Sequence, residues 1–170
     1  FAAQPTGWVA RMAALILAIA SSACQGTDSG SPVPGVTSAQ ALRAVETSVE
    51  AGGGALTLVV EAWRSFQPTV DRAAGDPLIA LLRVSTTAAE GLPGALRADS
   101  AWLAHGDDLV AMVPREEQPR EPGGRTVEFV VRAGPAWPTG DSLDVVVAIG
   151  GVRPAPLLLR APRAVIARVD

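Results

Sequence analysis

The sequence contains no lysine and no tyrosine, and only one cysteine and one histidine among its 170 residues. A single cysteine cannot form an internal disulfide. A zinc site takes several cysteine or histidine ligands, so a zinc site is close to excluded as well. Without lysine, the chain also lacks the glycine-rich phosphate-binding loop that ends in Lys-Ser/Thr. We therefore expect no metal and no cofactor.

Positive charge is scarce as well, and all of it is arginine. Fourteen basic residues stand against seventeen acidic ones, which gives a net charge of −3. Nucleic-acid binding needs a basic face that displaces counterions from phosphates, so this balance argues against a nucleic-acid partner. Hydrophobic residues make up 48% of the chain, which is enough for a folded core.

The longest uncharged run lies near the N-terminus and contains Cys24. Arg11 supplies a positive charge, and the apolar run Met12–Ala20 follows it. Next come the small residues Ser21, Ser22 and Ala23. A positive residue, 7–15 apolar residues and small residues before a cleavage site are the three parts of a secretory signal. The sequence therefore predicts export.

The same stretch resembles the lipobox of bacterial lipoproteins, in which small residues precede a cysteine that becomes the lipidated N-terminus. Ser22 and Ala23 fit that pattern, whereas Ser21 stands where lipoboxes usually have leucine. The resemblance implies that Cys24 carries the lipid. Gln25 is not the aspartate that marks inner-membrane retention, so the resemblance implies delivery to the outer membrane.

The alternative is an uncleaved membrane helix over residues 8–24, which would anchor a periplasmic domain in the inner membrane. A bilayer core needs about 20 apolar residues, and Met12–Ala23 falls short of that even when Trp8 is added at the interface. Residues 25–38 are rich in glycine, serine and proline and predict a flexible tether. We therefore expect a signal or anchor over residues 1–24, a tether over 25–38 and a domain over 39–170.

The domain shows short apolar runs with a two-residue period, separated by turn residues. Residues 39–51 fit either a helix capped by Ser38 or a strand, and the glycines at 52–54 favour a hairpin and hence a strand. Further strands are expected at 56–63, 78–86, 96–103, 109–113, 126–132, 143–149, 157–160 and 164–169. Seven to nine short strands predict an all-β fold, and the arrangement resembles the antiparallel sandwich of immunoglobulin-like domains of bacterial surface proteins. The cysteine pair of antibody domains is absent.

Few residues are candidates for catalysis, metal binding or ligand contact, and each has an ordinary structural explanation. His105 lies in a Gly-Asp turn without the Gly-x-Ser-x-Gly motif of a nucleophilic serine. Asp99, Asp107 and Asp108 lack the spacing of a calcium loop. Aromatic side chains can stack on ligands, yet Trp102 and Trp63 are expected in the core or at the ends of the sheets. The candidates for contact with a partner are Trp137, where packing is the favoured explanation, and Arg160 and Arg163 in the basic C-terminal region.

Together these observations predict no catalytic residues. The favoured hypothesis is a non-catalytic binding or scaffolding lipoprotein, tethered to membrane lipid through Cys24 and facing the periplasm or the cell surface, with a protein partner. The second is an accessory subunit of an integral membrane complex that retains residues 8–24 as a helix. The third is a hydrolase that uses paired carboxylates.

Overall fold

A computed structural model describes residues 35–67 and 75–170. The signal segment, including Cys24, and most of the expected tether lie outside these residues. The described elements are one short helix and eight strands: α1 (Ala39–Arg43), β1 (Ser48–Ala51), β2 (Gly54–Ser65), β3 (Leu78–Thr86), β4 (Arg97–His105), β5 (Asp108–Met112), β6 (Thr126–Gly134), β7 (Ser142–Gly150) and β8 (Leu157–Val169). The predicted all-β class is confirmed.

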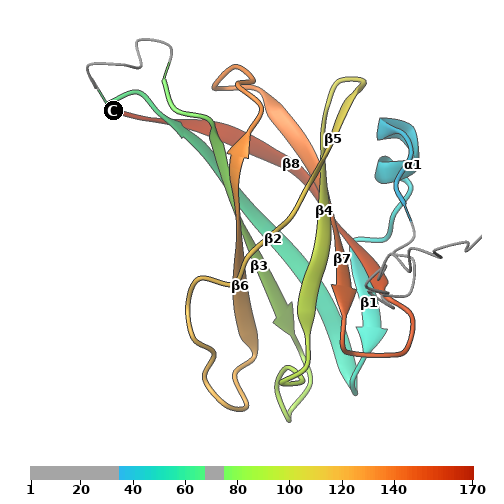
Figure 1. Cartoon of the computed structure of the whole chain (residues 1–170). Coiled ribbons are helices and arrows are strands. Elements are labelled where there is room, and N and C mark those ends of the chain that lie inside the picture. The colour runs from blue at the N-terminus through green and yellow to red at the C-terminus, as the bar shows by residue number, and fades with distance from the viewer. Residues whose placement is uncertain (1–34, 68–74) are drawn as a thin grey trace, which may run out of the picture.

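The strands form one curled sheet of mixed direction, in the order β5-β4-β7-β8-β2-β3-β6, with β1 paired to β2 (Figure 1). All pairings are antiparallel except that of β2 with β8. Strand β8 links two groups, because its first part pairs with β7 and its last four residues pair with β2. The sheet therefore consists of a four-strand group (β5, β4, β7, β8), a three-strand group (β2, β3, β6) and the short strand β1 beside β2.

Strand β8 corrects one sequence prediction. The runs 157–160 and 164–169 were expected as two strands, but they belong to one strand of 13 residues. Pro162 and Arg163 form a bulge between them, and the inward-facing positions shift there from Leu157, Leu159 and Ala161 to Ala164 and Ile166. Proline has no N–H to donate to a sheet and is tolerated at a bulge, so the interruption of the pattern marks a bend and not a strand end.

The core lies between the two groups of strands. In β3 every second residue from Leu78 to Thr86 is buried, and in β6 the buried positions Val127, Phe129 and Val131 are those expected from the alternation. These side chains join one cluster with residues of the four-strand group such as Leu103 and Val147. Full burial of each Leu or Val side chain contributes about 1.5–3 kcal/mol, so this shared cluster holds the two groups together.

A second, smaller cluster lies on the outer face of the four-strand group. Leu42 of α1 packs there with Trp102, Val146 and Ala148 from β4 and β7. The side-chain oxygen of Ser38 accepts a hydrogen bond from the backbone N–H of Ala41 at 3.0 Å, which is the predicted helix cap. The expected strand over residues 39–51 is therefore wrong for its first part, which is helical because its apolar residues pack on the apolar outer face of β4 and β7.

The hairpin predicted at residues 52–54 is present, and it joins β1 to β2. Gly52 and Gly53 both have positive φ, as the turn of a tight hairpin requires. Gly151, which follows β7, also has a positive φ (+80°), and a Cβ there would collide with the carbonyl oxygen of Ala95. Glycine at 151 therefore lets the β7–β8 connection pass close to the segment that enters β4.

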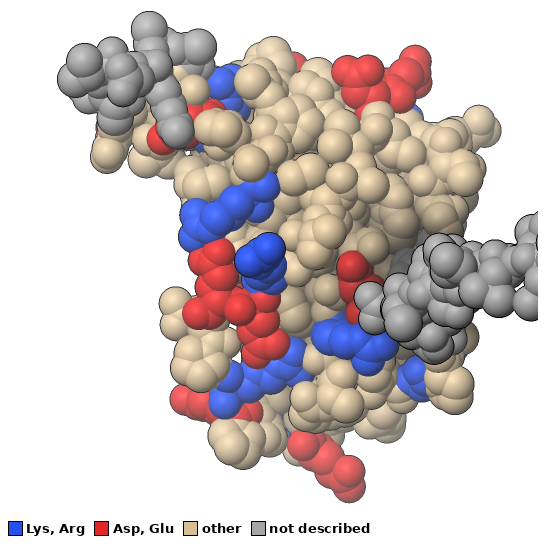
Figure 2. Space-filling view, in the orientation of Figure 1, with Lys and Arg blue, Asp and Glu red and all other residues tan. Residues whose placement is uncertain are grey.

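Charged side chains cover one flank of the molecule. In Figure 2 acidic and basic side chains alternate along the flank where Figure 1 shows β6 and the loop before it. Across the three-strand group, Arg83 of β3 pairs with Glu61 of β2 at 3.2 Å and with Glu128 of β6 at 2.8 Å. Its hydrogen bond to Glu128 raises the pKa of Arg83 above its ordinary value.

Candidate functional site

The bulge of β8 forms one wall of a pocket beside α1, which we call the arginine pocket. Its volume is about 400 Å³. It is lined by three arginines, one aspartate and three further residues, namely Arg43, Ser142, Leu143, Asp144, Arg160, Pro162 and Arg163. Two candidates from the sequence, Arg160 and Arg163, therefore line the same pocket.

Asp144 is the central acceptor of the arginine pocket. Its carboxylate accepts a hydrogen bond from Arg43 Nε at 3.1 Å and lies 3.7 Å from Arg160 Nη1. It also accepts a hydrogen bond from the backbone N–H of Arg163 at 3.3 Å, and this bond joins the bulge to β7. The side chain of Asp144 is 16% exposed, so these contacts are partly shielded from solvent screening.

Backbone carbonyls hold two of the arginines in place. Arg43 donates a hydrogen bond from Nη2 to the carbonyl of Gly106, and Arg160 donates from Nε to the carbonyl of Val45 at 2.8 Å. The backbone N–H of Arg160 also donates to the carbonyl of Glu46 at 2.9 Å. These bonds fasten the segment around α1 to the sheet, so Arg43 and Arg160 have a structural role whatever else they do.

Arg163 differs from the other two arginines. Its backbone has φ = 57°, in the left-handed region that non-glycine residues rarely adopt. Within residues 35–67 and 75–170 its guanidinium forms no hydrogen bond or ion pair. Three arginines and one aspartate thus line the pocket, so its lining carries an excess of positive charge.

Arg43 is the member of this site that the sequence did not reveal. It lies 117 positions before Arg160, and only the docking of α1 on the sheet brings the two together. Its position after an apolar Leu42 at the end of a capped segment is the one local signal that it lies in the last turn of a helix.

Trp137, the third candidate for contact with a partner, does not belong to the arginine pocket. It is buried (9% exposed) and stacks on His105 with 5.2 Å between the ring centroids. Its backbone carbonyl accepts a hydrogen bond from Arg64. Little of its surface is available to a partner, and packing, the explanation favoured from the sequence, describes its surroundings. Trp102 is likewise buried, as expected.

His105 has an acidic neighbour but no nucleophile. Its Nε2 lies 2.9 Å from Asp141 Oδ2, and among the described residues no hydroxyl group hydrogen-bonds to its ring. A catalytic triad needs a nucleophile within hydrogen-bond reach of the histidine. The His105–Asp141 pair therefore serves to join the end of β4 to the turn before β7.

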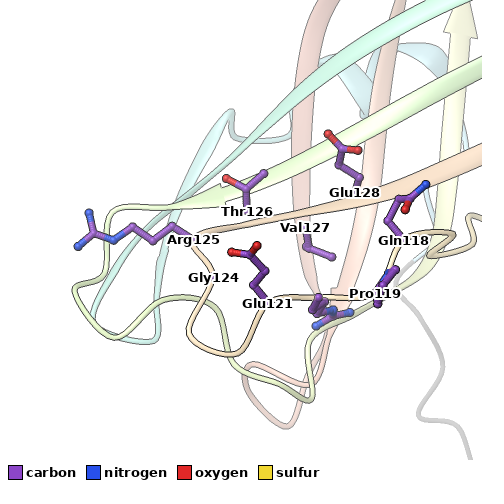
Figure 3. A pocket seen from close by; sticks show the side chains of 9 residues that line it. Gln118, Pro119, Glu121, Gly124, Arg125, Thr126, Val127 and Glu128 are labelled. Carbon is purple, nitrogen blue, oxygen red and sulfur yellow. The ribbon is translucent and has the colours of Figure 1, made fainter.

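A second pocket, of about 460 Å³, lies beside β6 and the loop that precedes it (Figure 3). Glu121 and Glu128 both line it, as a carboxylate pair would in a hydrolase. Glu128, however, accepts hydrogen bonds from Arg83, so it is already engaged in the ion pairs across the three-strand group. In the same loop, the hydrogen bond from Arg132 lowers the pKa of Glu117. The acidic side chains of this flank thus act mainly as partners of arginines.

In the described part of the chain, no group of three or more His, Cys, Asp or Glu side chains is arranged to hold a metal ion. Nor does that part contain a helix of the length and apolarity needed to cross a membrane. No family model, curated protein sequence or solved structure matches this chain.

Proposed function

We propose that this protein is a non-catalytic binding lipoprotein of a bacterial outer membrane, anchored through Cys24 and carrying an immunoglobulin-like sandwich that faces the periplasm or the cell surface. The observation that carries the binding role is the arginine pocket, where Arg163 has a strained backbone conformation and its guanidinium has no partner among the described residues. Strained residues persist where the surrounding structure enforces them, and they gather at functional sites.

The order of the strands supports the immunoglobulin-like assignment. In chain order, the seven strands β2 to β8 divide into β2-β3-β6 and β5-β4-β7-β8, and neighbours within each group are antiparallel. A division of seven strands into groups of three and four, packed over one core, is the arrangement of immunoglobulin-like domains. The core cluster draws on both groups, as a sandwich requires.

The tethering role is supported by the sequence before the domain and by the first described segment. The glycine-, serine- and proline-rich residues 25–38 follow the predicted lipidation site directly. Val36, Ala39 and Leu42 then pack on the outer face of the four-strand group. A lipid on Cys24 would therefore attach the domain to the membrane through a segment that is fixed to one face of the sheet.

Mass spectrometry of the full-length protein purified from its native membranes tests the proposal. We expect a mature chain that begins at a diacylated Cys24, and we expect Cys24→Ser to lose the lipid and leave the membrane fraction. An intact segment 1–23 without lipid would contradict the proposal and favour the accessory subunit with a retained helix. Crosslinking in native membranes would then identify the protein partner in either case.

A further inference from the structure

We infer that the arginine pocket binds a phosphate group. This inference rests on the proposed binding role and specifies its ligand, but it does not depend on the lipid at Cys24. The sequence pointed to Arg160 and Arg163 only as basic residues near the C-terminus. The pocket that they form with Arg43 and Asp144 shows what they can recognise.

The charge of the pocket matches a phosphate. Arg43, Arg160 and Arg163 contribute three positive charges and Asp144 contributes one negative charge. The lining therefore has an excess of two positive charges, and a phosphate monoester carries about −1.5 to −2 at pH 7. Arginine is also the residue best suited to this task, because its planar guanidinium presents paired N–H donors to phosphate oxygens.

The pocket is already arranged for an anion. Arg43 is held by the carbonyl of Gly106, and Arg160 by the carbonyl of Val45. The N–H of Arg163 is held by Asp144, which fixes the bulge from which the Arg163 side chain projects. A ligand would then have to order only the Arg163 side chain, and preorganisation of this kind increases affinity because less freedom is lost on binding.

The origin of the three arginines favours a tetrahedral anion over a carboxylate. Arg43 comes from α1, Arg160 from the regular part of β8 and Arg163 from its bulge. A carboxylate offers its two oxygens in one plane, whereas a phosphate offers oxygens in three or more directions, so it can accept from donors on separate backbone segments. The volume of about 400 Å³ leaves room for a substituent on the phosphate.

Titration of the full-length protein with inorganic phosphate at low ionic strength, followed by isothermal calorimetry, tests the inference. We expect saturable binding by the wild type and a loss of at least tenfold in affinity for Arg163→Gln. Arg153→Gln is the matched control, because it removes an equal charge at an exposed position outside the pocket. Absence of binding by the wild type, or equal weakening in the two variants, would overturn the inference.

The variant Arg163→Gly distinguishes a loss of phosphate affinity from a loss of stability. Glycine adopts positive φ readily, so this variant is expected to unfold at no lower temperature than the wild type while losing phosphate affinity as Arg163→Gln does. Retention of wild-type affinity by Arg163→Gly would contradict the inference, since that variant lacks the unpartnered guanidinium altogether.

The phosphate could belong to a lipid headgroup or to a soluble compound, and vesicles distinguish the two sources. Full-length Cys24→Ser is mixed with phosphatidylcholine vesicles that contain or lack phosphatidic acid, and bound protein is measured by co-sedimentation. Binding that requires phosphatidic acid, is displaced by inorganic phosphate and is lost in Arg163→Gln supports a lipid headgroup. Phosphate binding in solution without vesicle binding supports a soluble ligand, and failure of both overturns the inference while leaving the Cys24 proposal to its own test.

Discussion

Among the described residues, two other than glycine have left-handed backbone conformations, and each lies at a point where the pairing of two strands shifts register. Arg163 forms the bulge of β8, and Ala133 (φ = 59°) lies at the end of β6, where the pairing with β3 shifts register between Leu78 and Ala80. An L-residue in this conformation costs about 1–2 kcal/mol. The side chain of Arg163 lines a pocket and can donate hydrogen bonds, whereas the methyl group of Ala133 cannot hydrogen-bond to a ligand.

Ala133→Gly is therefore expected to stabilise the protein. Removing the methyl group relieves the left-handed strain, and the greater freedom of glycine in the unfolded chain offsets part of that gain. We expect the free energy of unfolding to rise by about 0.5–1 kcal/mol, measured by urea denaturation.

Ala111→Gly is the control for this substitution. Ala111 is an exposed residue of β5, paired with Trp102, and its φ is not positive. The same loss of a methyl group there should lower the stability by about 0.5–1 kcal/mol. Destabilisation of similar size in both variants would show that the backbone at Ala133 is not strained.

At the scale of single elements, α1 is the one helix among the described residues, and it completes the arginine pocket. It has only five residues, too few to be stable as an isolated helix. Its stability comes from Leu42, which is fully buried against the four-strand group, and from the bonds of Arg43. Docking of α1 and the geometry of the pocket are therefore linked.

Leu42→Ala is expected to weaken both features. Loss of a fully buried leucine should lower the free energy of unfolding by about 2–3 kcal/mol, and Arg43 should lose its fixed position. We expect faster amide hydrogen exchange in residues 39–46 and weaker binding of phosphate. Gln40→Ala, on the exposed side of α1, should leave all three quantities near the wild-type values. Unchanged exchange in Leu42→Ala would contradict this account of α1.

The same elements show which parts of the fold can be predicted from the sequence. Strands such as β3 and β6 follow from local alternation, because one face of each is buried against the core. The hairpin at Gly52 and Gly53 follows from turn chemistry. The assignment of residues 39–51 as a strand was wrong for its first part, because five helical residues and a four-residue strand share one short segment. Only the surface of β4 and β7 decides where the helix lies.

The candidate site was less predictable than the fold. The sequence contains four arginines near its C-terminal end, and no local pattern distinguishes Arg160 and Arg163 from Arg153 and Arg168. The structure distinguishes them, since Arg168 pairs with Asp170 and lies 4.2 Å from the centroid of the Phe66 ring. Arg43 joins the site only through tertiary contacts, which no local pattern encodes.

At the scale of the whole described domain, the two groups of strands share one hydrophobic core and one strand. Strand β8 begins beside β7 and ends beside β2, so neither group has an edge there that could open without breaking backbone hydrogen bonds. Leu58 and Phe129 of one group and Leu103 and Val145 of the other belong to the same cluster. Separating the groups would expose most of the buried apolar surface of both.

We therefore expect the domain to unfold as one cooperative unit. Two full-length variants that each keep a single tryptophan, Trp63 in β2 or Trp102 in β4, place a fluorescent reporter in each group, with the other tryptophans replaced by phenylalanine. Because the shared core couples the groups, the fluorescence transition in urea should coincide with the far-UV circular dichroism transition within each variant. A Trp102 transition at lower urea than the loss of circular dichroism, with no such difference for Trp63, would show that the four-strand group unfolds independently. That result would contradict a structure in which β8 and one core join the two groups.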